Sequence, residues 1–247
     1  MSRESFIAGV AGLVLMVGGP MSAQAQEEVE VRGNVSLTSD YTFRGISQTL
    51  EEPAVQGGLD VSGPLGLYAG VWGSSINFGE DLGIGPRAQL EMDAYVGIAP
   101  SAGPLALDFG ALYYGYPGAA EARDYDFVEL YGSAGTDIGP VSAGLTGAYS
   151  PDFFARSGTG WFGGAEASLA VPGTSIGLDA ALGRQWIEIN DNFGTPDYTF
   201  WSVGATTEVV GLGVGAAVVG PSLDNGQCFG GSDLCRTRLI VSVGRGL

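Results

Sequence analysis

Two acidic residues that lie two positions apart are the first candidates for chemistry in this sequence. Glu91 and Asp93 belong to the stretch LEMDAYVGI, and residues two apart share one face of a β-strand. A pair of carboxylates is the arrangement with which glycosidases donate and accept protons. The acids of NDNFGTPD, residues 190–197, form a second candidate, but their spacing does not match a calcium-binding EF-hand loop. We favour the simpler interpretation, in which both groups are solvated charge on a strand and in a loop.

Histidine is absent from the sequence, which argues against the many enzymes that use it as a general base or a metal ligand. The chain of 247 residues has no His and no Lys, with 27 acidic and 10 basic residues. A Ser-His-Asn hydrolase needs histidine as its general base, and histidine is also the commonest nitrogen ligand of metals. We therefore expect no enzyme activity, no metal site and no cofactor. The chain also lacks the basic patches that neutralise phosphates, which argues against nucleic-acid binding.

The first 25 residues have the features of an export signal. Arg3 precedes the apolar run FIAGVAGLVLMVG, residues 6–18, and Ala23-Gln24-Ala25 offers a small-x-small cleavage site. This run is too short to cross a bilayer as a stable helix, and no other stretch of the chain is longer. The sequence thus predicts a signal peptide over 1–25, cleaved after Ala25, and a single domain over 26–247.

Cys228 and Cys235 are the only two cysteines, in the stretch CFGGSDLC. Six intervening residues with two glycines can close a small loop. A lone pair of cysteines without further ligands is poor evidence for zinc. In an exported protein, this pair predicts a disulfide.

Beyond the signal, the chain alternates between apolar and polar residues, as β-strands do. In EVEVRGNVSLTSDYTFRG, residues 28–45, apolar side chains fall on odd positions from Val29 to Phe43 and polar ones on even positions. Helical periodicity is absent, and Gly and Pro recur at intervals that would break most helices. Twelve candidate strands follow one another: 29–43, 53–62, 65–78, 88–99, 104–116, 125–136, 139–150, 160–171, 174–188, 198–209, 211–220 and 235–246.

The connections between these strands alternate in length. Five are tight turns, near residues 63–64, 101–104, 138–140, 172–174 and 211. Six are longer loops: RGISQTLEE, GEDLGIGPR, PGAAEARD, PDFFARSGT, NDNFGTP and PSLDNGQCFGGSDL. Outer-membrane barrels sort their connections in this way, with short periplasmic turns and long extracellular loops. The pattern predicts an all-β fold, a transmembrane antiparallel up-and-down β-barrel of 12 strands, whose apolar face meets lipid.

The polar face of such strands would line the barrel interior. Assigned by parity, the pore-lining candidates are Glu30, Arg32, Asp40, Arg44, Asp60, Glu91, Asp93, Asp108, Glu129, Glu166, Asp179, Glu208, Arg236 and Arg238. The apolar core of a soluble β-sandwich would have to desolvate these acids with few basic partners, which is costly. A water-filled interior avoids that cost, so the barrel is favoured. Parity leaves the direction of Tyr68 and Trp72 open.

Aromatic residues gather near the long-loop ends of the predicted strands. Amphipathic rings favour the headgroup level of a membrane, so these residues predict an outward-facing belt. The set is Tyr41, Phe43, Phe78, Tyr113, Tyr116, Phe127, Tyr149, Phe153, Phe154, Trp161, Phe162, Trp186, Phe200 and Trp201.

Several ordered motifs resemble the TorF family of porins. They are SDYTFRGISQT (39–49), PAVQGGLDVSG (53–63), LYAGVWGSSINF (67–78), EMDAYVG (91–97) and YSPDFF (149–154). The resemblance covers most of residues 26–247 and implies an outer-membrane barrel of a Gram-negative bacterium with a channel role. Such barrels often end in Phe, where this chain has Leu247.

These observations together predict a channel for passive diffusion of small hydrophilic solutes across the outer membrane, with a preference for cations. Two alternatives stay open: a closed structural or adhesion barrel that acts through its surface loops, and an uptake channel specific for one substrate. The expected partners are outer-membrane lipid and lipopolysaccharide, the barrel-assembly machinery and small solutes. The sequence leaves open which solute passes, whether the interior is free, and the oligomeric state.

Overall fold

The structure, a computed structural model, describes residues 29–79 and 87–247. The predicted signal peptide and its cleavage site lie outside the described residues, as do Glu80 and Asp81 of the second long loop. Among the residues described, no helix is long and apolar enough to cross a membrane.

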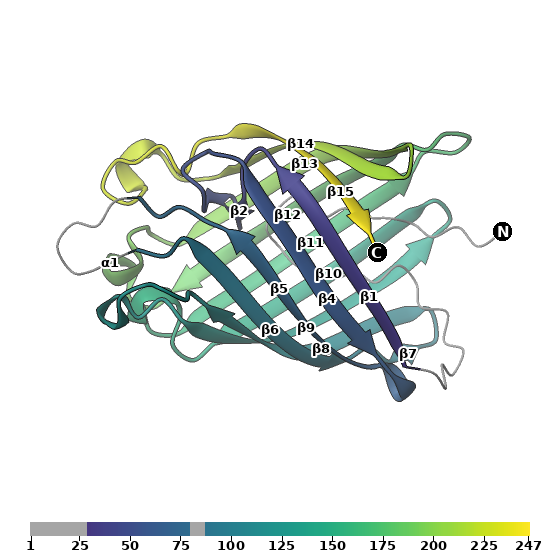
Figure 1. Cartoon of the computed structure of the whole chain (residues 1–247), viewed down its shortest axis with the longest axis horizontal. Coiled ribbons are helices and arrows are strands. Elements are labelled where there is room, and N and C mark those ends of the chain that lie inside the picture. The colour runs from purple at the N-terminus through teal and green to yellow at the C-terminus, as the bar shows by residue number, and fades with distance from the viewer. Residues whose placement is uncertain (1–28, 80–86) are drawn as a thin grey trace.

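Twelve antiparallel strands close into a barrel, as the alternating pattern predicts (Figure 1). The strands of the wall are β1 (Glu30–Thr38), β4 (Ala54–Ser62), β5 (Leu67–Ser75), β6 (Leu90–Ile98), β8 (Leu105–Gly115), β9 (Phe127–Ile138), β10 (Val141–Ser150), β11 (Gly160–Ala170), β12 (Gly177–Ile187), β13 (Tyr198–Val209), β14 (Leu212–Pro221) and β15 (Arg238–Gly246). The ring closes because β6 pairs with β8 and the first wall strand, β1, pairs with the last, β15.

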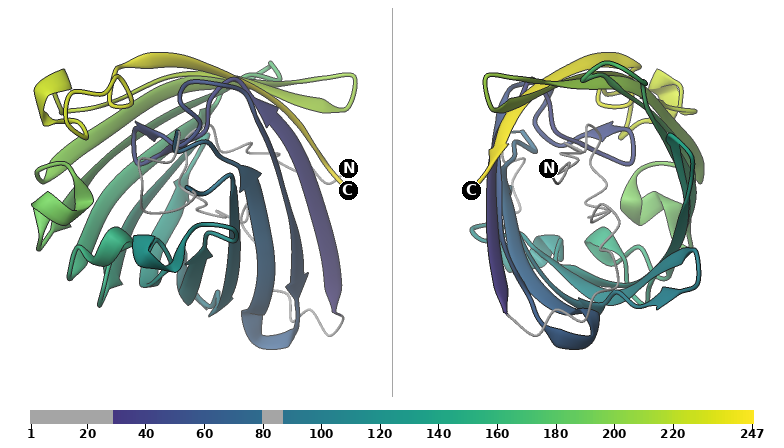
Figure 2. Two further views of the ribbon diagram at one scale, coloured as in Figure 1. Left: turned by 60° about the vertical axis from the view of Figure 1, so that its left-hand side comes forward. Right: turned by 90° about the vertical axis from the view of Figure 1, so that its right-hand side faces the viewer.

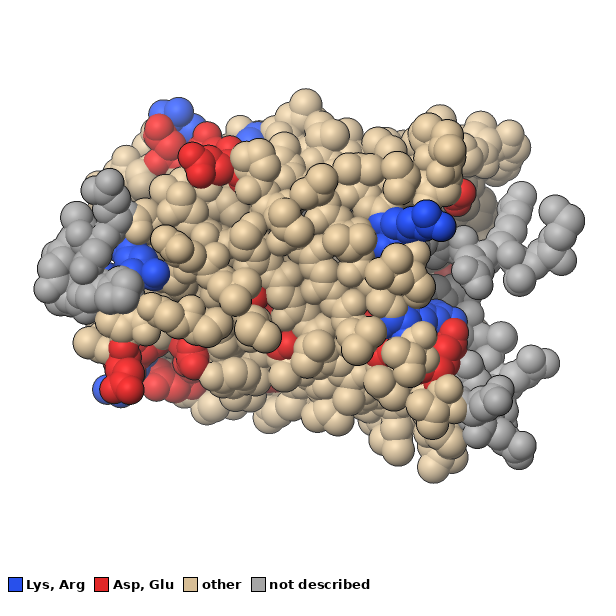
Figure 3. All heavy atoms as spheres, viewed as in Figure 1, with Lys and Arg blue, Asp and Glu red and all other residues tan. Residues whose placement is uncertain are grey.

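Side-chain direction follows the alternation of the sequence. On β6, Leu90 and Met92 are 41% and 52% exposed, whereas Glu91 and Asp93 between them are 1% and 4% exposed. The same contrast recurs along the wall, so apolar residues cover the outside of the barrel. Charged side chains gather near the two ends of the face in Figure 3 and leave a broad, largely uncharged band between them. A band of this kind is the surface that transmembrane barrels present to lipid.

Connections at the two ends of the barrel differ in length as predicted. At one end, hereafter the short-turn end, lie the tight turns, which contain the 3-10 turn η1 (Pro64–Gly66) and the two-residue strand β7 (Ser101–Ala102). Gly139 and Gly211 adopt φ of 65° and 75° in two of these turns, a conformation that glycine takes without steric cost. The opposite, long-loop end carries η2 (Glu121–Arg123), η3 (Phe154–Arg156), α1 (Asn190–Phe193) and η4 (Asn225–Gln227) (Figure 1).

The disulfide predicted from the cysteine pair is present. Cys228 and Cys235 are joined in the last long loop, and both side chains are buried. The bond closes a short loop next to η4.

The first predicted strand is wrong beyond Thr38. The alternation continues to Phe43, but β1 ends at Thr38, and residues 39–53 turn back into the barrel. Within this segment, hereafter the inserted loop, β2 (Thr42–Phe43) and β3 (Ile46–Ser47) form a small hairpin. A period of two marks an extended segment, but it does not say whether that segment joins the wall.

The predicted aromatic belt is only partly right. Tyr113, Trp161, Trp186 and Trp201 do face outward, with exposures between 37% and 56%. Many of the others are buried inside the barrel instead: Tyr41, Tyr116, Phe127, Phe153, Phe162 and Phe200. The reason is the inserted loop, which gives interior rings at the long-loop end an apolar surface to pack against.

Candidate functional site

The inserted loop occupies the interior of the barrel near the long-loop end. Viewed along the barrel, the wall forms a ring, and the hairpin of β2 and β3 lies inside that ring (Figure 2, right). Its turn is made by Arg44 and Gly45, with φ of 47° and 86°. A Cβ on Gly45 would lie 3.0 Å from the Phe200 Cβ and 3.2 Å from the Pro221 nitrogen. The hairpin tip is therefore pressed against β13 and β14.

Arg44 fixes the tip of the hairpin to the far wall of the barrel. Its guanidinium donates to both carboxylate oxygens of Glu129 on β9, at 2.9 and 2.7 Å, and to Gln185 Oε1 on β12, at 2.5 Å. Arg44 and Glu129 are only 2% and 3% exposed. The guanidinium also lies over the rings of Phe43 and Phe162, at 4.6 and 4.2 Å from their centroids. A bidentate pair enclosed by aromatic rings has little solvent screening, so it is a strong tether.

The base of the inserted loop is held by a second buried carboxylate. Asp40 accepts from the hydroxyls of Ser47 and Thr49, at 2.7 and 2.6 Å. Its other oxygen accepts from Arg238 of β15, at 2.7 Å. Asp40 thus ties the loop both to itself and to the strand that closes the barrel.

On the β5–β6 side, tyrosine hydroxyls take the place of a basic partner. Tyr41 of the inserted loop donates to Glu91 Oε1 at 2.7 Å, and Tyr116 also hydrogen-bonds this carboxylate. The Tyr41 ring meets Trp72 edge to face, with 5.4 Å between centroids. Trp72 therefore points inward, which settles one of the two directions that parity left open.

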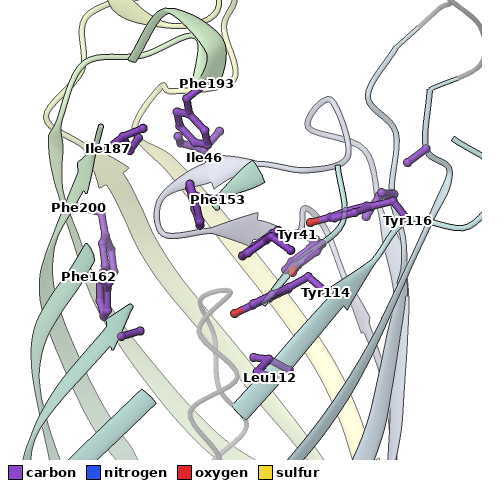
Figure 4. Close-up of a cluster of buried hydrophobic side chains, with 14 of the residues drawn as sticks. Tyr41, Ile46, Leu112, Tyr114, Tyr116, Phe153, Phe162, Ile187, Phe193 and Phe200 are labelled. Carbon is purple, nitrogen blue, oxygen red and sulfur yellow. The ribbon is translucent and has the colours of Figure 1, made fainter. Parts of the chain in front are cut away.

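Aromatic packing completes the closure of this half of the interior. Figure 4 shows Tyr41 and Ile46 of the inserted loop among side chains of the wall and of the long loops. Tyr114 stacks on Phe127 with 4.2 Å between centroids, and Phe127 meets Phe153 of the long loop after β10 at 4.8 Å. The interior near the long-loop end is thus a packed layer of rings with charges inside it.

Below this layer, the interior between the inserted loop and the short-turn end, hereafter the lower lumen, has a wall of tyrosines. Tyr68 on β5 donates to Asp108 on β8 at 2.5 Å and is also hydrogen-bonded to Tyr131 on β9. Tyr95 on β6 donates to Asp60 on β4. These bonds cross from strand to strand and turn Tyr68 inward, which settles the second open direction.

The tyrosines of this wall lie flat because a glycine faces each of them on the next strand. In register, Tyr68 pairs with Gly97 and Tyr95 with Gly70, while Tyr131 pairs with Gly110. A Cβ built on any of these glycines would come within 2.3 to 2.4 Å of the partner's hydroxyl oxygen. The missing Cβ atoms are what allow the rings to lie along the wall instead of across the lumen.

We expect Gly70→Ala to lift the Tyr95 ring off the wall. The added methyl has no room, so the variant should lose about 1–3 kcal/mol of unfolding free energy, as overpacked sites do. Urea unfolding of the refolded barrel measures this loss. Gly147→Ala on β10 is the matched control, because its nearest neighbour would be an oxygen 3.8 Å away. Equal stabilities of the two variants would contradict the role of the glycine.

The opposite wall of the lower lumen carries carboxylates among small residues. Glu166 on β11 and Asp179 on β12 are half-buried, and neither has a hydrogen-bond partner among the described residues. Their pairing partners in register, Ala181 and Ser168, are small. The lower lumen is therefore lined by aromatic faces with bonded acids on one side and by free acids on the other.

The structure distributes the fourteen pore-lining candidates over four places. The packed layer contains Asp40, Arg44, Glu91, Asp93, Glu129 and Arg238. The lower lumen contains Asp60, Asp108, Glu166 and Asp179. Near the short-turn end lie Glu30 and Arg32, which are ion-paired at 2.7 Å, and the exposed Glu208. Arg236 lies in the last long loop before β15, exposed and paired with Asp233.

Sequence reasoning missed the residues that act as partners of these charges. Tyr41, Gln185 and the tyrosines of the lower lumen complete the hydrogen bonds of the interior. A signal for the tyrosine wall was present, since inward positions of neighbouring strands alternate between Tyr and Gly once the register is known. No feature of the residue pattern predicts that Gln185 is a partner of Arg44.

Comparison with known proteins supports the architecture. No similar sequence was found among curated proteins. The NanC porin matches with a TM-score of 0.54 and 10% identity, over 87% of this chain and 98% of that chain. The COG4313 outer membrane channel from Pseudomonas putida F1 matches with a TM-score of 0.51 and 12% identity, over 92% of this chain and 99% of that chain. At such identities the likeness concerns the fold. Residues 22–246 match the family described as "Bacterial protein of unknown function (Gcw_chp)", and the chain belongs to this family.

Proposed function

We propose that this protein is an outer-membrane channel and not an enzyme, that it belongs with the porins of the TorF type, and that it lets small hydrophilic solutes diffuse passively. The observation that carries the proposal is a closed barrel with an apolar outer face and a lower lumen lined by polar and acidic groups. The signal peptide would export the chain, and the barrel-assembly machinery would insert it among outer-membrane lipid and lipopolysaccharide.

The balance of charge supports a preference for cations. Asp60, Asp108, Glu166 and Asp179 line the lower lumen, where the described residues include no arginine other than Arg32 near the short-turn end. Arg44 and Arg238 are each bound to a buried carboxylate in the packed layer, so their charges are already matched. Acidic walls of low dielectric raise the local concentration of cations, and acidic rings make cation channels selective.

A second candidate function has support from the inserted loop. Because the loop and its aromatic neighbours fill the interior near the long-loop end, the barrel is narrow or closed there in this conformation. A closed structural or adhesion barrel acting through its surface loops fits this observation, as does an uptake channel that opens for one substrate.

Single-channel recording in planar bilayers separates these functions. The diffusion channel that we propose conducts steadily, and its reversal potential in a KCl gradient shows cation preference. A structural barrel gives no current. A substrate-specific channel is blocked when its substrate is added. Anion preference would contradict the charge argument, and the absence of any current would contradict the channel.

A further inference from the structure

The packed layer holds more negative than positive charge on the β6 side. Glu91, Asp93 and Glu129 are all buried, and Asp93 lies within electrostatic range of both Glu91 and Glu129. Arg44 is the basic group of this cluster, and it is bound to Glu129. Burying unmatched carboxylates is costly, so something must balance the remaining charge.

Asp93 is the carboxylate of this cluster that lacks a partner. Glu91 is satisfied by two tyrosine hydroxyls, and Glu129 by Arg44 and Tyr114. Asp93 is 4% exposed, and its Oδ1 has no hydrogen-bond partner among the described residues. A buried polar atom without a partner needs an explanation, and a bound ion is one of the explanations that apply in proteins.

The surroundings of Asp93 are aromatic. Its neighbours in register are Trp72 on β5 and Tyr114 on β8. The ring of Tyr41 contacts Trp72, and the ring of Phe43 contacts Tyr114 with 5.7 Å between centroids. The inserted loop therefore covers the two aromatic neighbours of Asp93. Tyr95, the next inward residue of β6, belongs to the lower lumen, so the lower lumen begins one inward position beyond Asp93 on this strand.

An unpaired buried carboxylate beside aromatic rings favours one class of ligand, a monovalent cation. A divalent ion needs several oxygen ligands, and the described residues contain no group of three acidic, His or Cys side chains that could hold a metal ion. A monovalent cation needs fewer, because aromatic faces attract it as well. Asp93 and Tyr114 are only 4% and 6% exposed, which favours a small cation.

We propose that Asp93, flanked by Trp72 and Tyr114, binds a small monovalent cation, ammonium or an alkali-metal ion, beneath the inserted loop. The site deepens the proposed function and rests on it for access, because the cation reaches Asp93 through the lower lumen. Binding there neutralises the charge of the cluster and stabilises the seated loop.

The test compares melting temperatures of the full barrel in detergent at constant ionic strength. Ammonium, potassium and sodium chlorides are the probes, and N-methylglucamine chloride, whose cation is too large for the site, is the reference. A ligand that binds the folded state stabilises it, so we expect at least one small cation to raise the wild-type melting temperature by about 2–4 °C. The salt that gives the largest rise in melting temperature identifies the cation that the site prefers.

Three variants make the result specific. In Asp93→Asn, the cation-dependent rise should vanish, while the melting temperature in the reference salt increases because an unmatched charge is gone. Trp72→Leu keeps the carboxylate but removes one aromatic flank, and it should reduce the rise. Asp137→Asn at the short-turn end, where Asp137 accepts from Ser142, is the matched control and should keep the full rise.

Two outcomes would overturn the site. Equal wild-type melting temperatures in all four salts would mean that a proton neutralises Asp93, and a rise that survives in Asp93→Asn would place the cation elsewhere. Conductance of the same preparation keeps this test apart from the channel proposal. If the barrel conducts but shows no rise in melting temperature, the channel proposal stands and the cation site is refuted. If the barrel shows the rise but does not conduct, the cation site stands and the channel proposal is refuted.

Discussion

Arg44→Ala is expected to destabilise the barrel by about 3–5 kcal/mol, because it leaves Glu129 buried without its counter-charge. The same change should raise single-channel conductance, since it frees the hairpin tip from the far wall. Arg44 and Glu129 are almost fully buried and joined by two hydrogen bonds, so neither effect is damped by solvent. Urea unfolding and planar-bilayer recording measure the two effects on one preparation.

An exposed pair of the same type is the control for Arg44→Ala. Arg156 and Asp124 are joined at 2.9 Å, but their side chains are 70% and 34% exposed. Arg156→Ala should therefore change stability by less than about 1 kcal/mol and leave conductance alone. The double variant Arg44→Met with Glu129→Gln removes both charges and should recover much of the lost stability. A stable Arg44→Ala barrel with unchanged conductance would show that the tether is not what holds the loop.

The double variant Glu166→Gln with Asp179→Asn should lower the cation preference of the channel at least about twofold. These two side chains are the carboxylates of the lower lumen that are free of hydrogen bonds among the described residues, so their charges act on passing ions undiminished. Neutralising them also breaks no contact of the wall. The change in selectivity can therefore be assigned to charge.

Reversal potentials in a KCl gradient measure this effect, and salt dependence adds a second check. The difference between wild type and the double variant should shrink at high salt, where screening reaches only about 3 Å at 1 M. Asp126→Asn, outside the barrel wall and next to Tyr113, is the control and should leave the reversal potential unchanged. A double variant with wild-type selectivity would locate the selective step in the packed layer.

The wall of the barrel could be predicted from the sequence because its two signals are local. Period-two alternation and alternating connection length each depend on neighbouring residues, and they gave twelve strands and their closure correctly. The inserted loop could not be predicted, because Tyr41 and Phe43 continue the alternation of β1 although the strand ends at Thr38. What turns the chain inward is the set of bonds that Asp40 and Arg44 make with β15, β9 and β12, and these partners are far away in the sequence.

The candidate site was predictable in composition but not in arrangement. Parity assigns Glu91 and Asp93 to the same interior face, yet it does not say that tyrosines satisfy the first and leave the second without a partner. Likewise, parity assigns Arg44 to the interior but does not give its partner. The structure sends Arg44 across the interior to Glu129, because it sits on the hairpin and not on the wall.

The tethers of the inserted loop have a consequence for the order of events during assembly. The loop leaves the chain directly after β1, but its anchors are Glu129, Gln185 and Arg238, and Arg238 belongs to the last strand to be synthesised. The set of anchors is therefore complete only when β15 has met β1. A barrel in which β1 and β15 have not met lacks the Arg238 anchor, so joining these two edges is also the step that completes the fastening of the inserted loop.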